Sequence, residues 1–239
     1  MKTFWLETVD STNSEALRRL PELADGTVLA AREQTAGRGQ RGNTWFTEAG
    51  KNLTFSIVLK ALPLKAADSV RLNFLTSVAV ASFLESHGVD ASIKWPNDIY
   101  VGSRKICGML IENTLGPGGQ LMASVIGIGI NVNQTEFPQL ANATSMALCT
   151  GKEYELEPAL EGFLGVFESW FSRLDSEELF ATYSARLFRK GVSAPYHDLL
   201  TDREYTGVIE GVEPDGRLHI RDTEGNDLYY RFKEVSYIL

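Results

Sequence analysis

Hydrophobic and polar positions change their spacing along this chain of 239 residues, and the changes predict where strands give way to helices. Between Asn52 and Lys60 apolar residues take every second position, which predicts a half-buried strand. Residues 66–86 are apolar throughout their middle and stop at His87 and Gly88, which predicts a long helix ending at a glycine. We expect this helix to pack beneath a sheet.

The rest of the first 190 residues mixes both patterns. Thr12, followed three residues later by Glu15, predicts a capping box that opens a helix through Leu20. From Ala91 to Asn133, short β-rich runs are broken by turn residues, which favours successive hairpins of an antiparallel or mixed sheet. The other expected elements are strands at residues 4–9 and 27–32 and amphipathic helices at residues 157–174 and 176–188.

The pattern changes again after Gly191, where short apolar runs alternate with turn residues. The expected strands lie at residues 205–212, 217–221, 227–232 and 234–238. We therefore predict an α+β fold in two domains. Residues 1–190 form a mixed or antiparallel sheet with packed helices, and residues 191–239 form a small β-barrel.

Composition narrows the class of protein. The net charge of −8 and a pI near 5.0 argue against a general nucleic-acid binder, which needs a basic surface. The two cysteines, Cys107 and Cys149, form neither a disulfide framework nor a metal-ligand spacing. No stretch is long and apolar enough for a membrane span, and the N-terminus lacks a signal-peptide pattern. We expect a cytoplasmic protein that binds neither DNA nor a membrane.

The most informative segment is the stretch from Gln34 to Trp45, in which three glycines alternate with two arginines. Glycine lets the backbone approach a ligand, and successive free N–H groups in such a turn form an anion-binding concavity. Arg38 and Arg41 add planar, permanently charged donors for a phosphate or a carboxylate. This stretch, called the lid below, predicts a flexible cover over an anion; the same composition is also found in solvated turns.

Three further segments follow the lid in chain order. They are Lys94-Trp95-Pro96-Asn97-Asp98, Arg104-Lys105-Ile-Cys-Gly108-Met-Leu-Ile-Glu112 and Gly127-Ile-Gly129-Ile-Asn131-Val-Asn133. Together with the lid and the early Ser11-Thr12-Asn13, this set resembles the biotin–protein ligase family, over residues 11 to 145. The last segment is not a dinucleotide fingerprint, because it lacks the third glycine and the helix that should follow.

The resemblance implies a class II synthetase-like catalytic domain with an SH3-like C-terminal barrel, in the form without a DNA-binding domain before Phe4. It implies that biotin and ATP give biotinyl-5′-AMP and pyrophosphate, and that the acyl group then passes to one lysine of a biotin carboxyl carrier domain. ATP with Mg²⁺ and biotin are the expected substrates, and the metal ligands stay open. The family includes monomers and homodimers.

The first step brings a carboxylate against the α-phosphate of ATP, so it requires fixed positive charge. By resemblance we assign this role to Arg38 and Lys105, although a lysine in a hairpin is commonly a solvated turn charge. Arg104 is expected to point to the opposite face of the strand and to be solvated. In the second step, a carboxylate that accepts the proton of the acceptor amine is needed, and Asp98 is our candidate.

The resemblance also implies a binding site. Polar groups for the ureido ring of biotin come from Ser11, Thr12, Asn13 and Gln34. The other predicted binding residues are Gly37, Arg38, Gly39, Gln40, Arg41, Trp45, Lys105, Gly108 and Asn131, the last near adenine or the metal–phosphate group. Several have structural alternatives: Ser11 or Thr12 as a helix cap, Trp45 as a core residue, and the Asn97-Asp98 pair as a structural turn.

One position departs from the family pattern. Residue 40 is Gln, where many relatives carry a second adjacent arginine in the lid; the amide donates a hydrogen bond but brings no charge.

Two other functions compete with a biotin ligase. A lipoate–protein ligase shares the fold but lacks this lid together with Lys-Trp-Pro-Asn-Asp. An RNA- or protein-binding module is disfavoured by the acidic pI.

Overall fold

The computed structural model describes residues 1–138, 140 and 142–239, with all of their side chains except that of Arg41. Its larger sheet has seven strands in the order β1-β2-β3-β7-β6-β5-β4. The β1–β2 pair is parallel and all the other pairs are antiparallel. The strands are β1 (Lys2–Val9), β2 (Thr27–Gln34), β3 (Leu53–Lys60), β4 (Ser92–Lys94), β5 (Asp98–Val101), β6 (Arg104–Leu115) and β7 (Leu121–Ile130).

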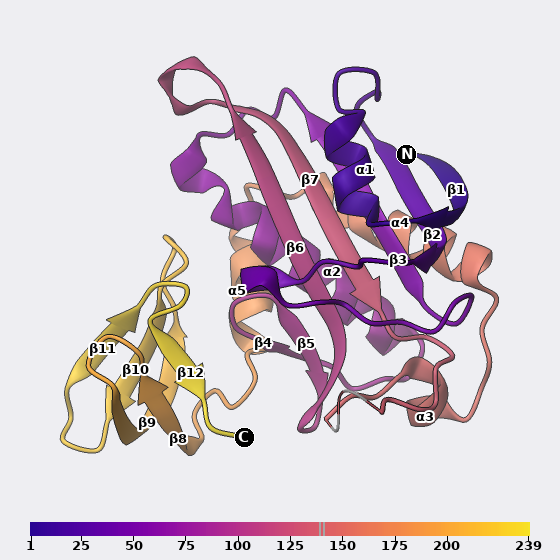
Figure 1. Ribbon diagram of the computed structural model, residues 1–239. Helices are drawn as coiled ribbons and strands as arrows, with labels where there is room; N and C mark the ends of the chain where they lie inside the picture. Colours follow the sequence, from indigo (N-terminus) through magenta and orange to yellow (C-terminus); the bar gives the residue numbers. More distant parts are fainter. Residues whose placement is uncertain (139, 141) are drawn as a thin grey trace.

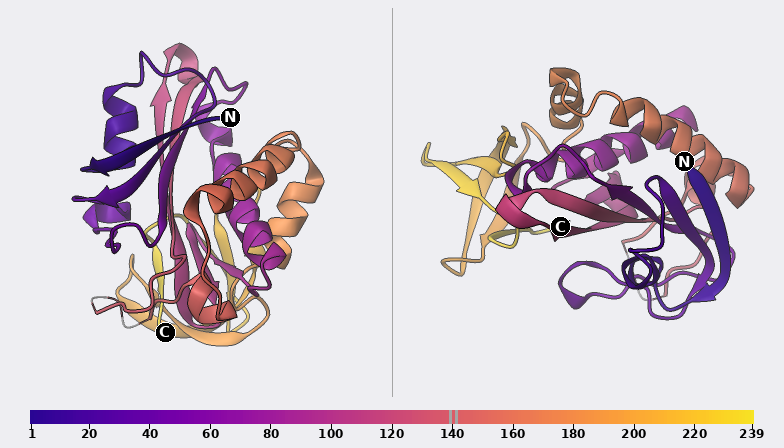
Figure 2. Two further views of the ribbon diagram at one scale, coloured as in Figure 1. Left: turned by 90° about the vertical axis from the view of Figure 1, so that its right-hand side faces the viewer. Right: turned by 90° about the horizontal axis from the view of Figure 1, so that it is seen from above.

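Helices cover both faces of this sheet (Figures 1 and 2). Helix α1 (Thr12–Arg18) lies on one face, and α2 (Val70–Ser86), α4 (Leu156–Phe171) and α5 (Glu177–Ala185) lie on the other. The predicted long helix is confirmed, except that residues 66–68 form a separate 3₁₀ turn before it. It ends at His87, and Gly88 follows with a left-handed φ of 79°.

The prediction of a half-buried β3 is wrong, because seven of its eight residues are buried. Phe55 packs edge-on against Phe163 of α4, with ring centroids 5.2 Å apart. On the opposite face, Val58 belongs to a second apolar cluster with Ala16 of α1. The alternation between apolar and polar residues is present, but α1 covers the polar face as well.

The start of α1 differs from the predicted Thr12 capping box and agrees with the alternative that Ser11 caps the helix. The N-cap is Ser11, whose hydroxyl accepts from the backbone N–H of Ser14 at 3.5 Å, so the helix begins one residue earlier than a Thr12 cap requires. The N–H of Thr12 instead donates to the side chain of Gln34. This shift turns the side chains of Thr12 and Asn13 inward, where both are buried.

The C-terminal part forms a separate five-stranded antiparallel sheet in the order β11-β10-β9-β8-β12 (Figure 1). Its strands are β8 (Ser193–Asp198), β9 (Arg203–Val212), β10 (Leu218–Asp222), β11 (Asp227–Tyr230) and β12 (Val235–Tyr237). The sequence prediction missed β8, which contains Pro195, a residue that is rare inside strands. It also missed the short helix α3 (Met146–Thr150). The predicted α+β class, with the hairpins from β4 to β7, is confirmed.

A hydrogen bond from the indole of Trp95 connects the larger sheet domain to the C-terminal sheet. Trp95 is buried, and its Nε1 donates to the carbonyl of Gly216, in the turn between β9 and β10, at 2.9 Å. In the described part of the chain, no helix has the length and apolar character to cross a membrane.

Candidate active site

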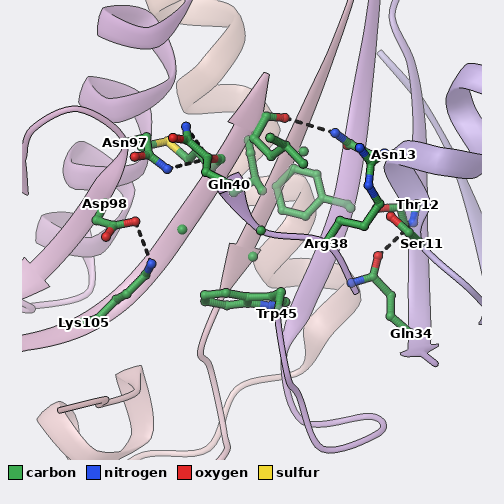
Figure 3. A pocket seen from close by; sticks show the side chains of 18 residues that line it. Ser11, Thr12, Asn13, Gln34, Arg38, Gln40, Trp45, Asn97, Asp98 and Lys105 are labelled. Carbon is green, nitrogen blue, oxygen red and sulfur yellow. Dashed lines mark hydrogen bonds and ion pairs between the residues drawn. The ribbon is translucent and has the colours of Figure 1, made fainter. Parts of the chain in front are cut away.

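A cavity lies where the lid crosses the exposed face of β6 and β7, next to the N-terminus of α1 (Figure 3). Its volume is about 50 Å³. Eleven of the predicted site residues line it: Ser11, Thr12, Asn13, Gln34, Arg38, Gly39, Gln40, Trp45, Asp98, Lys105 and Gly108. The other lining residues are Phe55, Asn97, Met109, Leu110, Gly127, Ile128 and Gly129. The fold therefore brings segments from six parts of the sequence to one place.

A hydrogen-bond network forms the polar end of the cavity. The N–H of Thr12 donates to Oε1 of Gln34 at 2.8 Å. The hydroxyl of Ser56 on β3 lies 2.8 Å from Oγ1 of Thr12 and 2.6 Å from Oδ1 of Asn13. Because the amide oxygen can only accept, the single Ser56 proton goes to Asn13 and the Thr12 hydroxyl donates to Ser56. Three polar side chains are thus fixed in buried positions.

The two glycines of β7 make room for side chains from other elements. A Cβ at Gly127 would overlap the amide of Asn13, and a Cβ at Gly129 would overlap the indole of Trp45. Gly129 pairs with Gly108 of β6, so the floor beneath Trp45 has no side chains in either strand. The side chains of Asn13 and Trp45 therefore approach this strand closely.

The lid folds back on itself. The N–H of Gly39 donates to the carbonyl of Asn43 at 2.7 Å, and the N–H of Trp45 donates to the carbonyl of Gly37 at 2.9 Å. Gly37 itself does not line the cavity; a Cβ there would overlap the Trp45 carbonyl, so its role is to let the two arms of the lid close together. The indole Nε1 of Trp45 is buried without a hydrogen-bond partner in the described structure.

Arg38 forms a two-pronged ion pair with Glu112 of β6. Its two terminal nitrogens lie 2.8 Å and 3.1 Å from the carboxylate oxygens of Glu112. The same carboxylate accepts from Nδ2 of Asn13 at 2.9 Å. The lid is therefore connected to the buried network through one acidic side chain.

Lys105 and Asp98 form a second ion pair, with 2.6 Å between Nζ and Oδ1 (Figure 3). Asp98 stands opposite Gly108 in the β5–β6 ladder, and the register of this ladder shifts between Ile99 and Tyr100. A Cβ at residue 108 would lie 3.2 Å from Nζ of Lys105, so the glycine leaves the space in which the amine crosses toward Asp98. Arg104 is exposed, as its position in the strand predicts.

A second cavity of about 300 Å³ lies on the other side of this ion pair, between the lid and β12. Lys94 lines it, with its ammonium 5.1 Å from the ring centre of Tyr100 and 4.7 Å from that of Tyr237. Burial lowers the pKa of Lys94, while the nearby Asp98 carboxylate acts in the opposite direction. Gln40 borders both cavities, and its Oε1 is buried without a partner in the described structure.

Besides Gly37, one predicted residue whose side chain the structure describes, Asn131, lies elsewhere. Asn131 does not line either cavity: its buried amide donates to the carbonyl of Thr144 at 2.9 Å, so it fixes the segment before α3. The side chain of Arg41 lies outside the described structure. Sequence reasoning gave no role to Ser56 and Glu112. Polar residues on the second face of β3, and a carboxylate within the apolar β6, are the signals that could have indicated them.

The described residues contain no cluster of three or more His, Cys, Asp or Glu side chains able to hold a metal ion. Cys107 is fully buried, and burial raises the pKa of its thiol, so it is not a nucleophile here. The cavity contains two cations, Arg38 and Lys105, each paired with a carboxylate. They lie beside a polar pocket with apolar walls. Such a site suits an anionic substrate with a neutral polar end.

Comparisons with known proteins agree with this geometry. The sequence profile of the Biotin/lipoate A/B protein ligase family matches residues 5–131, more than half of the chain. The chain is similar to the biotin–[acetyl-CoA-carboxylase] ligase of Paracoccus denitrificans, with 31% identity over 93% of this chain and 95% of that protein. It is also 31% identical to the bifunctional ligase/repressor BirA of Escherichia coli, over 89% of this chain and 67% of that protein.

A solved structure has the same fold. The biotin protein ligase of Aquifex aeolicus, in complex with biotin and ATP, superposes with a TM-score of 0.81 at 27% identity. The superposition covers 98% of this chain and 97% of that chain, so the similarity includes the C-terminal sheet as well as the larger one.

Proposed function

Since this chain belongs to the Biotin/lipoate A/B protein ligase family, we propose that its lid cavity binds biotin and that the residues around the cavity carry both steps of a biotin–protein ligase. The reaction itself has two steps. The enzyme activates biotin as biotinyl-5′-AMP, with release of pyrophosphate, and then transfers the biotinyl group to a lysine of an acceptor protein. The observation that carries the site assignment is the convergence of Lys105, Arg38 and the Ser11–Asn13 turn on one cavity.

The biotin ring is assigned to the polar end of the cavity. Ser11, Thr12, Asn13 and Gln34 supply donors and acceptors for a ureido group, and Phe55 supplies part of the apolar wall. The volume of this cavity is about 50 Å³. Sites for small ligands typically have volumes of about 300 Å³ or more, so the cavity is too small in this conformation. We therefore expect the lid to open when biotin enters, with Trp45 leaving the glycine floor.

Activation joins two anions. A carboxylate oxygen of biotin attacks the α-phosphorus of ATP, and the bond from that phosphorus to the bridging oxygen of the β-phosphate breaks as pyrophosphate leaves. Lys105 and Arg38 would stabilise the negative charge that is compressed in this step. Mg²⁺ would enter on the phosphates of ATP.

Transfer then needs a base. The amine of the acceptor lysine attacks the acyl carbon, AMP leaves, and the amine loses a proton. We assign Asp98, a carboxylate that lines the cavity, as acceptor of this proton; after it releases the proton to water, the carboxylate pairs with Lys105 again. The nucleotide would lie over Gly108 and Gly129, with Trp45 closing over it; the role of Asn131 near adenine stays a prediction.

The acceptor is proposed to be the carrier domain of a biotin-dependent carboxylase, and the enzyme is proposed to act in the cytoplasm without DNA, as a monomer or homodimer. We also propose the division at residue 190. Its support is that every strand of the smaller sheet follows that point in the chain.

Biotin-dependent exchange of pyrophosphate into ATP tests this function directly. The exchange should require biotin, and lipoate should not replace it. Equal exchange with lipoate would favour the lipoate–protein ligase. No exchange with either acid, in a folded protein, would favour a binding module without enzymatic activity.

A further inference from the structure

Glu112 lies at the junction of the lid and the biotin pocket, and neither the sequence nor the two reaction steps assign it a role. It stands in β6 with a side chain that is 26% exposed, directly behind the cavity-lining residues Met109 and Leu110. Its carboxylate contacts two of the residues proposed to bind substrate, Arg38 and Asn13.

The ion pair between Glu112 and Arg38 of the lid uses only some of the N–H donors of the arginine. A guanidinium carries five N–H donors, and the fork from Arg38 to Glu112 uses one on each terminal nitrogen. A further weak contact at 3.4 Å joins Arg38 to the hydroxyl of Ser14. The Nε–H and one outer N–H remain for a substrate anion, so Arg38 can keep its partner in the lid-closed state and still bind a phosphate or carboxylate.

The contact with the pocket fixes the orientation of an amide. The two protons of Asn13 Nδ2 go to Glu112 at 2.9 Å and to the carbonyl of Leu110 at 3.1 Å. With both donors directed toward β6, the amide oxygen faces Ser56, 2.6 Å away. Without the carboxylate, the nitrogen end of the amide would keep only the carbonyl of Leu110 and would lose its charged partner.

From these contacts we propose that Glu112 is a positioning residue that couples lid closure to biotin recognition. One carboxylate holds Arg38 over the cavity and Asn13 within it, so ordering either of them favours the other. The lid arginine is then already aligned when substrate arrives, which reduces the ordering cost of binding. This inference rests on the proposed function of the same site.

Two substitutions distinguish the contact of the Glu112 carboxylate with Arg38 from its contact with Asn13. Glu112→Gln keeps an acceptor for Asn13 but loses the charged fork to Arg38, whereas Glu112→Leu loses both. The readout is kcat/KM for biotin in pyrophosphate exchange. We expect a fall of about tenfold for Glu112→Gln and of about a hundredfold for Glu112→Leu, in the range of lost hydrogen bonds to charged groups.

Coupling is tested by repeating both substitutions in an Arg38→Gln background. There Glu112→Gln should have almost no further effect, because its partner is gone, whereas Glu112→Leu should still reduce kcat/KM through Asn13. The control is Glu178→Gln, which removes an arginine–glutamate pair far from the cavity, in which one terminal nitrogen of Arg173 contacts both carboxylate oxygens; it should leave kcat/KM unchanged.

An equal effect of Glu112→Gln in both backgrounds, or none in the wild-type background, would overturn the proposal. Should Glu112→Gln fail to fold, Glu112→Asp is a second test, since it keeps the charge but withdraws the carboxylate by one methylene from both Arg38 and Asn13; an unchanged kcat/KM for biotin in that variant would likewise overturn the proposal. Wild-type protein without biotin-dependent exchange would instead overturn the proposed function, so the two failures are distinguishable.

Discussion

Asp98 and Lys105 are joined across the β5–β6 hairpin, with the carboxylate oxygen 2.6 Å from the amine, and both side chains are largely buried beside the lid. The lysine that we assign to adenylation and the carboxylate that we assign to transfer are thus each other's nearest charge. Substitution of either one therefore tests one step while changing the environment of the other.

Lys105→Ala should reduce adenylate formation by about a hundredfold or more, because the lost charge acts where the two anions meet. The free energy of unfolding should change far less. Pyrophosphate exchange and urea unfolding measure the two effects. The neighbouring Arg104→Ala is the control, since Arg104 is exposed and should have normal exchange. If the Lys105→Ala protein folds and its exchange rate is unchanged, Lys105 is only a solvated turn charge and has no role in adenylation.

Asp98→Asn should slow transfer more than adenylation. The amide oxygen can still accept from Lys105 and hold it in place, but it cannot take the proton of the acceptor amine. Single-turnover experiments, first with biotin and ATP and then with preformed biotinyl-AMP and a carrier domain, resolve the two rates. Equal slowing of both steps would indicate that Asp98 acts only by orienting Lys105.

Gly129→Ala should impair the site with little effect on the fold, because the new methyl group overlaps the indole of Trp45. We expect displacement of Trp45 and a rise in KM for ATP of about tenfold, equivalent to about 1.4 kcal/mol. Gly165→Ala in α4 is the control: nothing surrounds a Cβ there, so it should leave KM unchanged and stabilise the helix slightly. A normal KM in Gly129→Ala would remove Trp45 from the nucleotide site.

Acid should weaken the support of the Ser11 turn. Hydrogen bonds from Arg18 lower the pKa of Asp10 from 3.8 to about 2. A depressed pKa in the folded state stabilises the protein above the unfolded value, and this contribution is lost as the pH falls from about 4 to about 2. The pair is exposed, so the contribution is below about 1 kcal/mol.

Unfolding by urea across this pH range measures it. Asp10→Asn should be less stable than wild type at pH 7, and the difference should shrink as the pH falls below about 4. A difference that stays constant down to pH 3 would show that the charge of Asp10 is not its source.

Gln40→Arg should slow the escape of biotinyl-AMP only modestly, by less than about tenfold, or about 1.4 kcal/mol. Gln40 already borders the cavity and reaches the carbonyl of Met109 at 3.4 Å, and Arg38 remains as a lid cation. The release rate of biotinyl-AMP without acceptor measures the effect. Rapid loss from wild type, reversed by orders of magnitude in the variant, would show that the missing charge governs retention.

Most of the elements and most of the site residues could be predicted from the sequence alone. Alternating apolar residues located β3, and a long apolar run that stops at His87 and Gly88 located α2, because these patterns are set by neighbouring residues. The short motifs identified the lid, the Ser11 turn and the hairpin that carries Lys105, because their combination and order along the chain resemble one family. These are local properties, and each can be read from a few neighbouring residues.

Only the tertiary structure decided which of these residues meet. The register shift in β5–β6 and the missing side chain of Gly108 place Lys105 against Asp98, and neither is visible in spacing. The polar face of β3 became buried because α1 covers it, which brought Ser56 to Asn13. Glu112 and Arg38 are 74 residues apart, and their fork depends on how the lid crosses β6. Periodicity tells which face of a strand is buried, but the partner on that face is fixed by packing between distant segments.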